Sequence, residues 1–234
     1  MTPLLEISGL EVEVDRTHLL GPVTVSLDSR GITAVLGPNG AGKSLFLHAI
    51  HGLIPADSGG VTWAGRAASE TRARRGFVFQ ATPVMRRSVF ANVAFPLAAA
   101  GIRGAERRAR VAAALAQARL SGREQVPAAR LSGGERQRMA LARAVVTRPD
   151  AVLLDEPAAN LDPASTKELE AMLHEISGNG TKIMIATHDL AQARRLAGDV
   201  LFFDSGRLIA HSPSPAFFED AQDRTVRRYL EGRL

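Results

Sequence analysis

The spacing of apolar residues predicts two kinds of strand in this chain. Residues 4–14 and 22–28 alternate apolar with polar positions, which predicts half-buried antiparallel strands. Shorter apolar runs predict strands buried on both faces of a parallel sheet: 32–36, 151–154, 182–186 and 200–203. Residues 76–80 add one more short strand.

Helical periodicity fills most of the intervals between these strands. Helices are predicted at the following segments: 43–52, 132–146, 163–176 and 190–196. The first ends at a glycine cap signal, and the second is capped by Ser132 and bounded by Pro149. From Ala81 to Arg130 the strand signal disappears and an Ala- and Arg-rich helical pattern replaces it, which indicates an inserted helical region.

Strands that alternate with helices predict an α/β fold with a mainly parallel sheet. We expect a single domain over residues 1–234. Its catalytic core, with an N-terminal antiparallel β subdomain, would comprise residues 1–80 and 149–212. An α-helical subdomain would occupy 81–148. A last hairpin that ends near residue 210 would lead into a C-terminal helix within 213–234.

Composition narrows the class of protein. The 234 residues are 45% hydrophobic and 23% charged, as in an ordinary globular protein, and the absence of cysteine excludes disulfides, zinc ribbons and thiol catalysis. A net charge of +5 could favour nucleic acid or an anionic membrane, but a solvated surface is the preferred interpretation. We find neither a membrane span nor a signal-peptide pattern, so we expect a soluble intracellular protein.

The segment from Gly37 to Ser44, GPNGAGKS, fits the phosphate-loop pattern GxxxxGK[ST] between a predicted strand and a predicted helix. Its glycines let backbone N–H groups turn toward a phosphate, and the helix start adds a positive dipole end. Lys43 can reach the β- and γ-phosphates, and the Ser44 hydroxyl is a suitable ligand for Mg²⁺. The pattern therefore predicts a nucleotide site.

Two neighbouring carboxylates, Asp155 and Glu156, end a buried strand. Side chains alternate along a strand, so the two carboxylates point in different directions. One can support Mg²⁺ through water while the other orients or deprotonates an attacking water, as phosphoryl transfer to water requires.

The segment LSGGE at residues 131–135 is a second glycine-rich helix start, where a second anion can bind. With it, the chain resembles the nucleotide-binding subunits of ABC transporters over residues 4–212. GPNGAGKS resembles the Walker A motif, LSGGE the signature LSGGQ, and AVLLDE the Walker B motif with the catalytic glutamate. Gln80 stands at the Q-loop position, residues 160–162 resemble the D-loop, and residues 187–189 resemble the switch-histidine segment.

The resemblance implies a RecA-like P-loop NTPase core and a role for each matching residue. It assigns ATP to Gly37, Pro38, Asn39, Gly40, Ala41, Gly42, Lys43, Ser44 and Leu45. It assigns Mg²⁺ to Ser44, Gln80 and Asp155, and catalysis to Lys43, Gln80, His188 and Glu156, with Glu156 as general base. The γ-phosphate held by a second copy would face Ser132, Gly133, Gly134 and Glu135, near Asp162 of the D-loop. Because each site is then shared, the resemblance implies a head-to-tail homodimer.

Two positions depart from the family's pattern. Glu135 replaces the usual glutamine of the signature, and Val14 stands where the family places an aromatic residue that stacks on adenine. No aromatic residue occurs in the neighbouring segment 11–20. We therefore expect modest affinity for ATP and weak discrimination against GTP, since stacking contributes on the order of 1–3 kcal/mol in comparable sites.

The resemblance extends to bacterial importers, most closely to the ATPases of tungstate-type oxyanion importers, with molybdate and phosphate systems next. It implies separate transmembrane permease subunits, an indirect link to a substrate-binding protein, and a place on the inner face of the cell membrane. Residues 83–88 would line the groove for a permease helix, with Arg86 or Arg87 in contact. Another importer, a split exporter, a nucleic-acid-associated ATPase and a non-hydrolysing ATP sensor remain alternatives. The 51 residues between Gln80 and Ser132 are too few for a long coiled coil, and we expect no nucleic-acid partner.

Overall fold

The computed structural model describes residues 3–15 and 17–233, and a six-stranded sheet runs through its centre. The strand order is β10-β9-β3-β8-β7-β6. The strands are β3 (Ile32–Leu36), β6 (Arg75–Val78), β7 (Ala151–Asp155), β8 (Lys182–Ala186), β9 (Asp199–Asp204) and β10 (Arg207–Pro213). All neighbours are parallel except β10, which pairs antiparallel with β9. The mainly parallel sheet is therefore confirmed.

An antiparallel sheet covers one side of this core, with the order β2-β1-β4-β5. It contains β1 (Leu5–Val14), β2 (Thr17–Leu27), β4 (Ser58–Trp63) and β5 (Arg66–Ala67). The prediction missed β4 and β5 and started β2 at residue 22 instead of Thr17. Gly21 and Pro22 in β2 and the glycines of β4 indicate breaks in the sequence, but bulged pairing with β1 keeps both segments in the sheet. Strand β5 has only two residues and pairs with β4.

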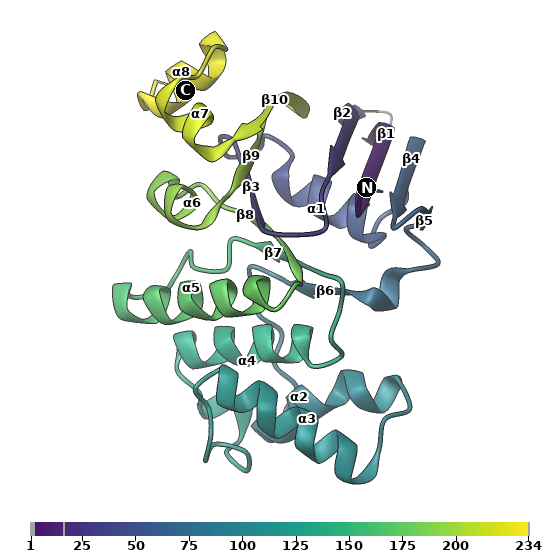
Figure 1. Ribbon diagram of the computed structural model, residues 1–234, viewed down its shortest axis with the longest axis vertical. Helices are drawn as coiled ribbons and strands as arrows, with labels where there is room; N and C mark the ends of the chain where they lie inside the picture. Colours follow the sequence, from purple (N-terminus) through teal and green to yellow (C-terminus); the bar gives the residue numbers. More distant parts are fainter. Residues whose placement is uncertain (1–2, 16, 234) are drawn as a thin grey trace.

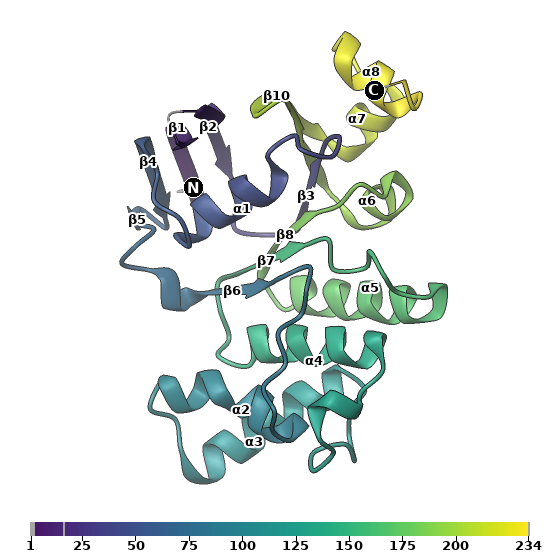
Figure 2. The same ribbon diagram turned by 180° about the vertical axis from the view of Figure 1, so that it is seen from behind.

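The helical subdomain lies at the opposite end of the long axis from the antiparallel sheet and the C-terminal helices (Figures 1 and 2). It contains α2 (Val89–Ala99) and α3 (Gly104–Gln117), which pack against each other and against α4 (Gly133–Val145). Helix α4 also contacts β6 and α5 (Pro163–Gly178), so it connects the helical subdomain to the core.

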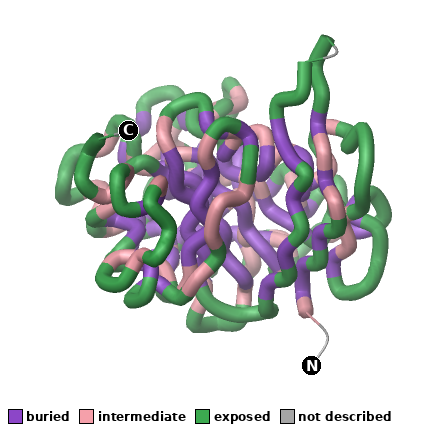
Figure 3. Tube along the Cα trace, turned by 90° about the horizontal axis from the view of Figure 1, so that it is seen from above, coloured by how far each residue is buried: buried purple, intermediate pink, exposed green. Residues whose placement is uncertain are grey.

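Apolar packing on both faces of the central sheet explains why its inner strands β3, β7 and β8 are buried along their whole length, whereas the edge strand β10 is not. Buried segments run through the middle of the molecule (Figure 3). One core lies between the antiparallel sheet, α1 (Lys43–His51) and the nearer face of the central sheet. The other lies between the opposite face, α4, α5, α6 (Leu190–Leu196) and the helical subdomain. Because both faces of the sheet are covered, the ends of its strands are where a ligand can reach it.

The C-terminal region differs from the prediction. Strand β10 continues to Pro213, and two short helices follow in place of one, α7 (Ser214–Glu219) and α8 (Arg224–Leu230). Pro213 precedes α7, whereas Asp223 starts α8 anew by accepting the backbone N–H groups of Thr225 and Val226. Across residues 3–15 and 17–233, none of the helices has the length and apolar character needed to cross a membrane.

Candidate nucleotide site

The phosphate loop, residues 37–44, connects β3 to α1 and is shaped by its glycines. Gly37 has a φ of 149°, and a Cβ there would lie 2.1 Å from the carbonyl oxygen of Phe203. Gly42, with a φ of 96°, immediately precedes α1. This conformation brings the first N–H groups of α1 to the end of the central sheet, where they can bind an anion.

Lys43 is 7% exposed, and its ammonium donates to the carbonyl oxygens of Gly37 at 2.8 Å and Pro38 at 2.9 Å. Burial lowers the pKa of Lys43, while the charges of Glu156 and Asp155 oppose that shift. The lysine is thus held against its own loop, with two carboxylates close enough to favour its charged form.

The carboxylates at the end of β7 lie against the phosphate loop. Ser44 Oγ donates to Asp155 Oδ1 at 2.9 Å, and Asp155 is 6% exposed. Glu156 follows in the left-handed region, with a φ of 46°, a conformation that costs energy for a residue other than glycine. Its Oε2 lies 2.8 Å from Nδ1 of His188, which follows β8. The fold thereby joins residues that are far apart in the sequence.

A cavity of about 510 Å³ surrounds the phosphate loop. It is lined by Leu19, Asn39, Gly40, Ala41, Gly42, Lys43, Ser44, Leu45, Gln80, Glu156 and His188. Among the described residues, the lining includes Leu19 of β2 and does not include Val14, although both side chains are exposed. The sequence interpretation missed Leu19, because an apolar residue in a strand gives no signal of its own.

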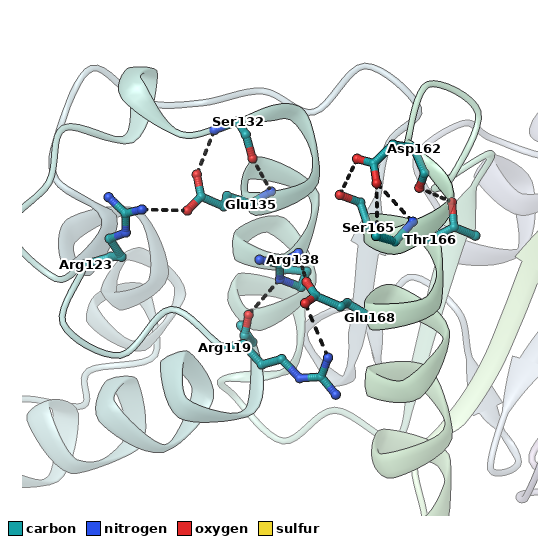
Figure 4. Close-up of polar contacts among 11 residues, drawn as sticks. Arg119, Arg123, Ser132, Glu135, Arg138, Asp162, Ser165, Thr166 and Glu168 are labelled. Atoms are coloured by element: carbon teal, nitrogen blue, oxygen red, sulfur yellow. Dashed lines mark hydrogen bonds and ion pairs between the residues drawn. The ribbon is translucent and has the colours of Figure 1, made fainter.

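The signature segment, residues 131–135, forms a capping box at the start of α4 (Figure 4). The Ser132 hydroxyl accepts the N–H of Glu135 at 3.2 Å, and the Glu135 carboxylate accepts the N–H of Ser132 at 2.9 Å. That backbone hydrogen bond is the main reason why the pKa of Glu135 is lowered, and Arg123, 3.1 Å away, adds to the effect. Glu135 therefore fixes the position of Ser132.

The D-loop lies beside the signature segment (Figure 4). Asp162 caps α5 by accepting the N–H groups of Ala164 at 3.0 Å and Ser165 at 2.9 Å. A Cβ on Gly134 would lie 2.7 Å from the Cβ of Ser165, so the glycine is what allows α4 and α5 to approach here.

Further along the same two helices, Arg138 of α4 pairs with Glu168 of α5, and Arg119 approaches Glu168 at 3.6 Å (Figure 4). Together with the Gly134 contact, these ion pairs join the start of α4 to the helix that follows the D-loop. The signature and D-loop segments are thus packed against each other within one chain.

A second cavity, of about 460 Å³, separates the signature helix from the phosphate-loop side of the molecule. Gln80 and Glu156 line both cavities, and Gly133 and Asn160 line the second. Of the four predicted signature residues, none lines the phosphate-loop cavity as far as the structure is described. Within one chain, the structure therefore brings together the phosphate-loop, strand-end and switch-histidine residues, but not the signature.

Comparison with known proteins identifies the family of this chain. Residues 20–159 match the ABC transporter family. The tungstate uptake system ATP-binding protein TupC of Peptoclostridium acidaminophilum is 35% identical over 205 residues, which cover 87% of this chain and 96% of that protein. The Fe(3+) ions import ATP-binding protein FbpC of Streptomyces coelicolor is 38% identical and covers 97% of this chain, with 67% of its own length matched.

A solved structure gives the same result for the fold. The cbiO1 protein of Clostridium perfringens, part of the ABC transporter complex cbiONQ, superposes with a TM-score of 0.85 at 28% identity. The match covers 100% of this chain and 96% of that one. The chain belongs to the ABC transporter family, as an ATP-binding subunit that hydrolyses ATP to drive transport.

Proposed function

We propose that this ATPase energises the uptake of an oxyanion, tungstate first and molybdate or phosphate next, through separate membrane subunits. The observation that supports tungstate is the near full-length match to the tungstate protein, 96% of which is covered, against 67% for the iron protein. Phosphate import proteins match at 33% identity over 92% of their length, and a cobalt import protein at 36% over 82%.

Uptake measurements test this proposal. A strain that lacks the chain should accumulate less tungstate than its parent, and a plasmid copy should restore the content. A copy with Glu156→Gln serves as the matched control and should fail to restore it. Equal tungstate content in the deleted and parent strains, with a loss of molybdate, phosphate, iron or cobalt instead, would reassign the transported ion.

The residues of the site support a direct mechanism for ATP hydrolysis. Lys43 and the N–H groups of the phosphate loop hold the phosphates, which concentrates positive charge where negative charge develops. Glu156 accepts a proton from the attacking water, and His188, 2.8 Å away, orients that carboxylate and senses the γ-phosphate. Replacing Glu156 by Gln should lower turnover by about 10²–10⁴-fold and leave ATP binding intact. Full turnover in this variant would show that Glu156 is not the general base.

Mg²⁺ fits the same site. Ser44 Oγ and Asp155 Oδ1 lie 2.9 Å apart at the phosphate loop, and both are oxygen donors of the kind that the ion prefers. Gln80 supplies an amide oxygen at the cavity wall. When bound, Mg²⁺ would offset charge on the β- and γ-phosphate oxygens.

The separation of the signature from the phosphate-loop cavity supports a head-to-tail homodimer. Ser132, Gly133, Gly134 and Glu135 would then complete the site of a second copy, with Asp162 next to them. Ser132 and Gly133 are exposed, which suits this role. The Glu156→Gln variant should form dimers when ATP is added, as measured by sedimentation. Replacing Ser132 in that variant should weaken the dimer.

An apolar cavity of about 730 Å³ between the core and α2 supports membrane docking. It is lined in part by Phe77, Phe79, Val84, Met85 and Phe95. Asn92, fully buried in α2, holds Met85 by two hydrogen bonds, 3.0 Å from the Met85 N–H and 3.2 Å to its carbonyl oxygen. The segment 83–88 is therefore a fixed wall, suited to receive a permease helix on the inner face of the membrane.

Arg86 and Arg87 are exposed next to this groove and are proposed to contact the permease helix. Changing both to Glu should abolish uptake while the purified chain keeps its ATPase activity. Arg108→Glu, at an exposed position of α3, is the matched control and should leave uptake unchanged. Normal uptake in the Arg86/Arg87 variant would contradict the contact.

A further inference from the structure

The C-terminal helix α8 reaches the phosphate loop through the only tyrosine of the chain. The hydroxyl of Tyr229 donates to the carbonyl oxygen of Gly37 at 3.4 Å, although the two residues are 192 positions apart. The Tyr229 ring packs on Phe202 of β9, with centroids 5.0 Å apart. Helix α8 contacts β10 at the end of the molecule opposite α2 and α3 (Figures 1 and 2).

The oxygen that Tyr229 contacts also holds the phosphate-loop lysine. Lys43 Nζ donates to the same Gly37 oxygen at 2.8 Å. A carbonyl oxygen has two lone pairs, so it can accept from the tyrosine and the lysine at once. The direction of that carbonyl therefore bears on where the lysine ammonium lies.

Strand β9 also restrains Gly37. The Phe203 carbonyl oxygen would lie 2.1 Å from a Cβ at Gly37, so the loop backbone is pressed against β9. The preceding residue, Phe202, supports the tyrosine ring. Burial raises the pKa of Tyr229, the contact with Gly37 opposes that shift, and the charge of Glu156 adds to the rise, so the hydroxyl is protonated and can donate to the carbonyl.

We propose that Tyr229 is a positioning residue for ATP binding, whose hydroxyl fixes the Gly37 carbonyl and thereby directs Lys43 toward the phosphates. Residues 224–230 are then part of the nucleotide site and not a passive terminal helix. The inference rests on ATP binding by this family member and is independent of the ion transported.

Tyr229→Phe tests the hydroxyl alone, because the phenylalanine ring can keep its packing on Phe202. With the purified full-length chain, we expect the KM for ATP and the dissociation constant of ATP by calorimetry to rise about two- to four-fold, the lower part of what one neutral hydrogen bond supports. We expect kcat to change by less than two-fold. Arg227→Ala, at an exposed position of the same helix, is the matched control and should leave all three values unchanged.

Three results would overturn the proposal. One is ATP affinity in Tyr229→Phe equal to that of the parent. Another is a fall in kcat at unchanged KM, because it would place the tyrosine in the chemical step. The third is an equal loss of affinity in Arg227→Ala, because it would indicate a general effect of α8. All of these measurements use nucleotide alone, so failure of the oxyanion proposal would leave them unchanged.

Discussion

His51 allows the dependence of stability on pH to be worked out from the structure. The side chain is 7% exposed at the end of α1, and its ring meets Phe77 edge-on at 5.4 Å. Burial, and then the charge of Arg75, lower the pKa of His51 from 6.5 to about 4. His51 is therefore neutral in the folded protein at physiological pH, and protonation opposes folding.

The sign and size of the effect follow from the two pKa values. Between pH 6.5 and about 4 the unfolded chain binds a proton at His51 that the folded chain does not, so the free energy of unfolding falls as the pH falls. Each pH unit in this interval costs about 1.4 kcal/mol. Lowering the pH from 7 to 5 should therefore remove about 2 kcal/mol of stability through this residue alone.

Urea unfolding of the parent and of His51→Gln at pH 7 and pH 5 measures this contribution. The substitution itself changes the free energy of unfolding at both pH values. The informative quantity is therefore how the difference in that free energy between the two proteins changes from pH 7 to pH 5. That difference should shift by about 2 kcal/mol in favour of the variant at pH 5. His174→Gln, which changes an exposed histidine of α5, should follow the parent. Equal losses of stability in the parent and in His51→Gln would refute the reasoning.

Three further predictions concern the site. Gly134→Ala should destabilise the protein by about 1–3 kcal/mol in thermal or urea unfolding, because its Cβ would overlap Ser165, and adding Ser165→Gly should recover part of that loss. Glu135→Ala should cost about 1 kcal/mol by removing an acceptor of the capping box, whereas Glu135→Gln, which keeps an acceptor, should stay within about 0.5 kcal/mol of the parent. ATP and GTP should be hydrolysed with similar kcat/KM, and Val14→Tyr should raise the preference for ATP, because the added ring can stack on adenine; a strong ATP preference in the parent would contradict the argument.

The central sheet was predictable because its strands meet a simple physical requirement. Strands packed on both faces have no polar face, so runs such as 32–36 and 183–186 are apolar apart from Thr33 and stand out in the sequence. The chemical residues lie just beyond the ends of such strands: Glu156 is the first residue after β7, and His188 is the second after β8. Their proximity follows from parallel strand order, which turns distant motifs into neighbours.

The small elements were not predictable for the opposite reason. Strand β4 carries Gly59 and Gly60, and its place in the antiparallel sheet is set by pairing with β1, a contact that no local pattern encodes. The division of the C-terminal region into α7 and α8 depends on Asp223 acting as a new cap. An aspartate in a polar segment is consistent with a cap, a turn or a solvated surface.

Two residues near the phosphate loop, Leu19 and Tyr229, belong to no sequence motif and could not be predicted. Motifs identify the residues that touch phosphate, because phosphate chemistry requires particular residue types at fixed spacing. The residues around them need only the right shape or a single hydrogen bond, so Leu19 of β2 can line the cavity and Tyr229 of α8 can contact the loop without any recognisable pattern. The sequence therefore predicts the reaction better than the affinity, and the Tyr229 and Val14 variants examine the part that it leaves open.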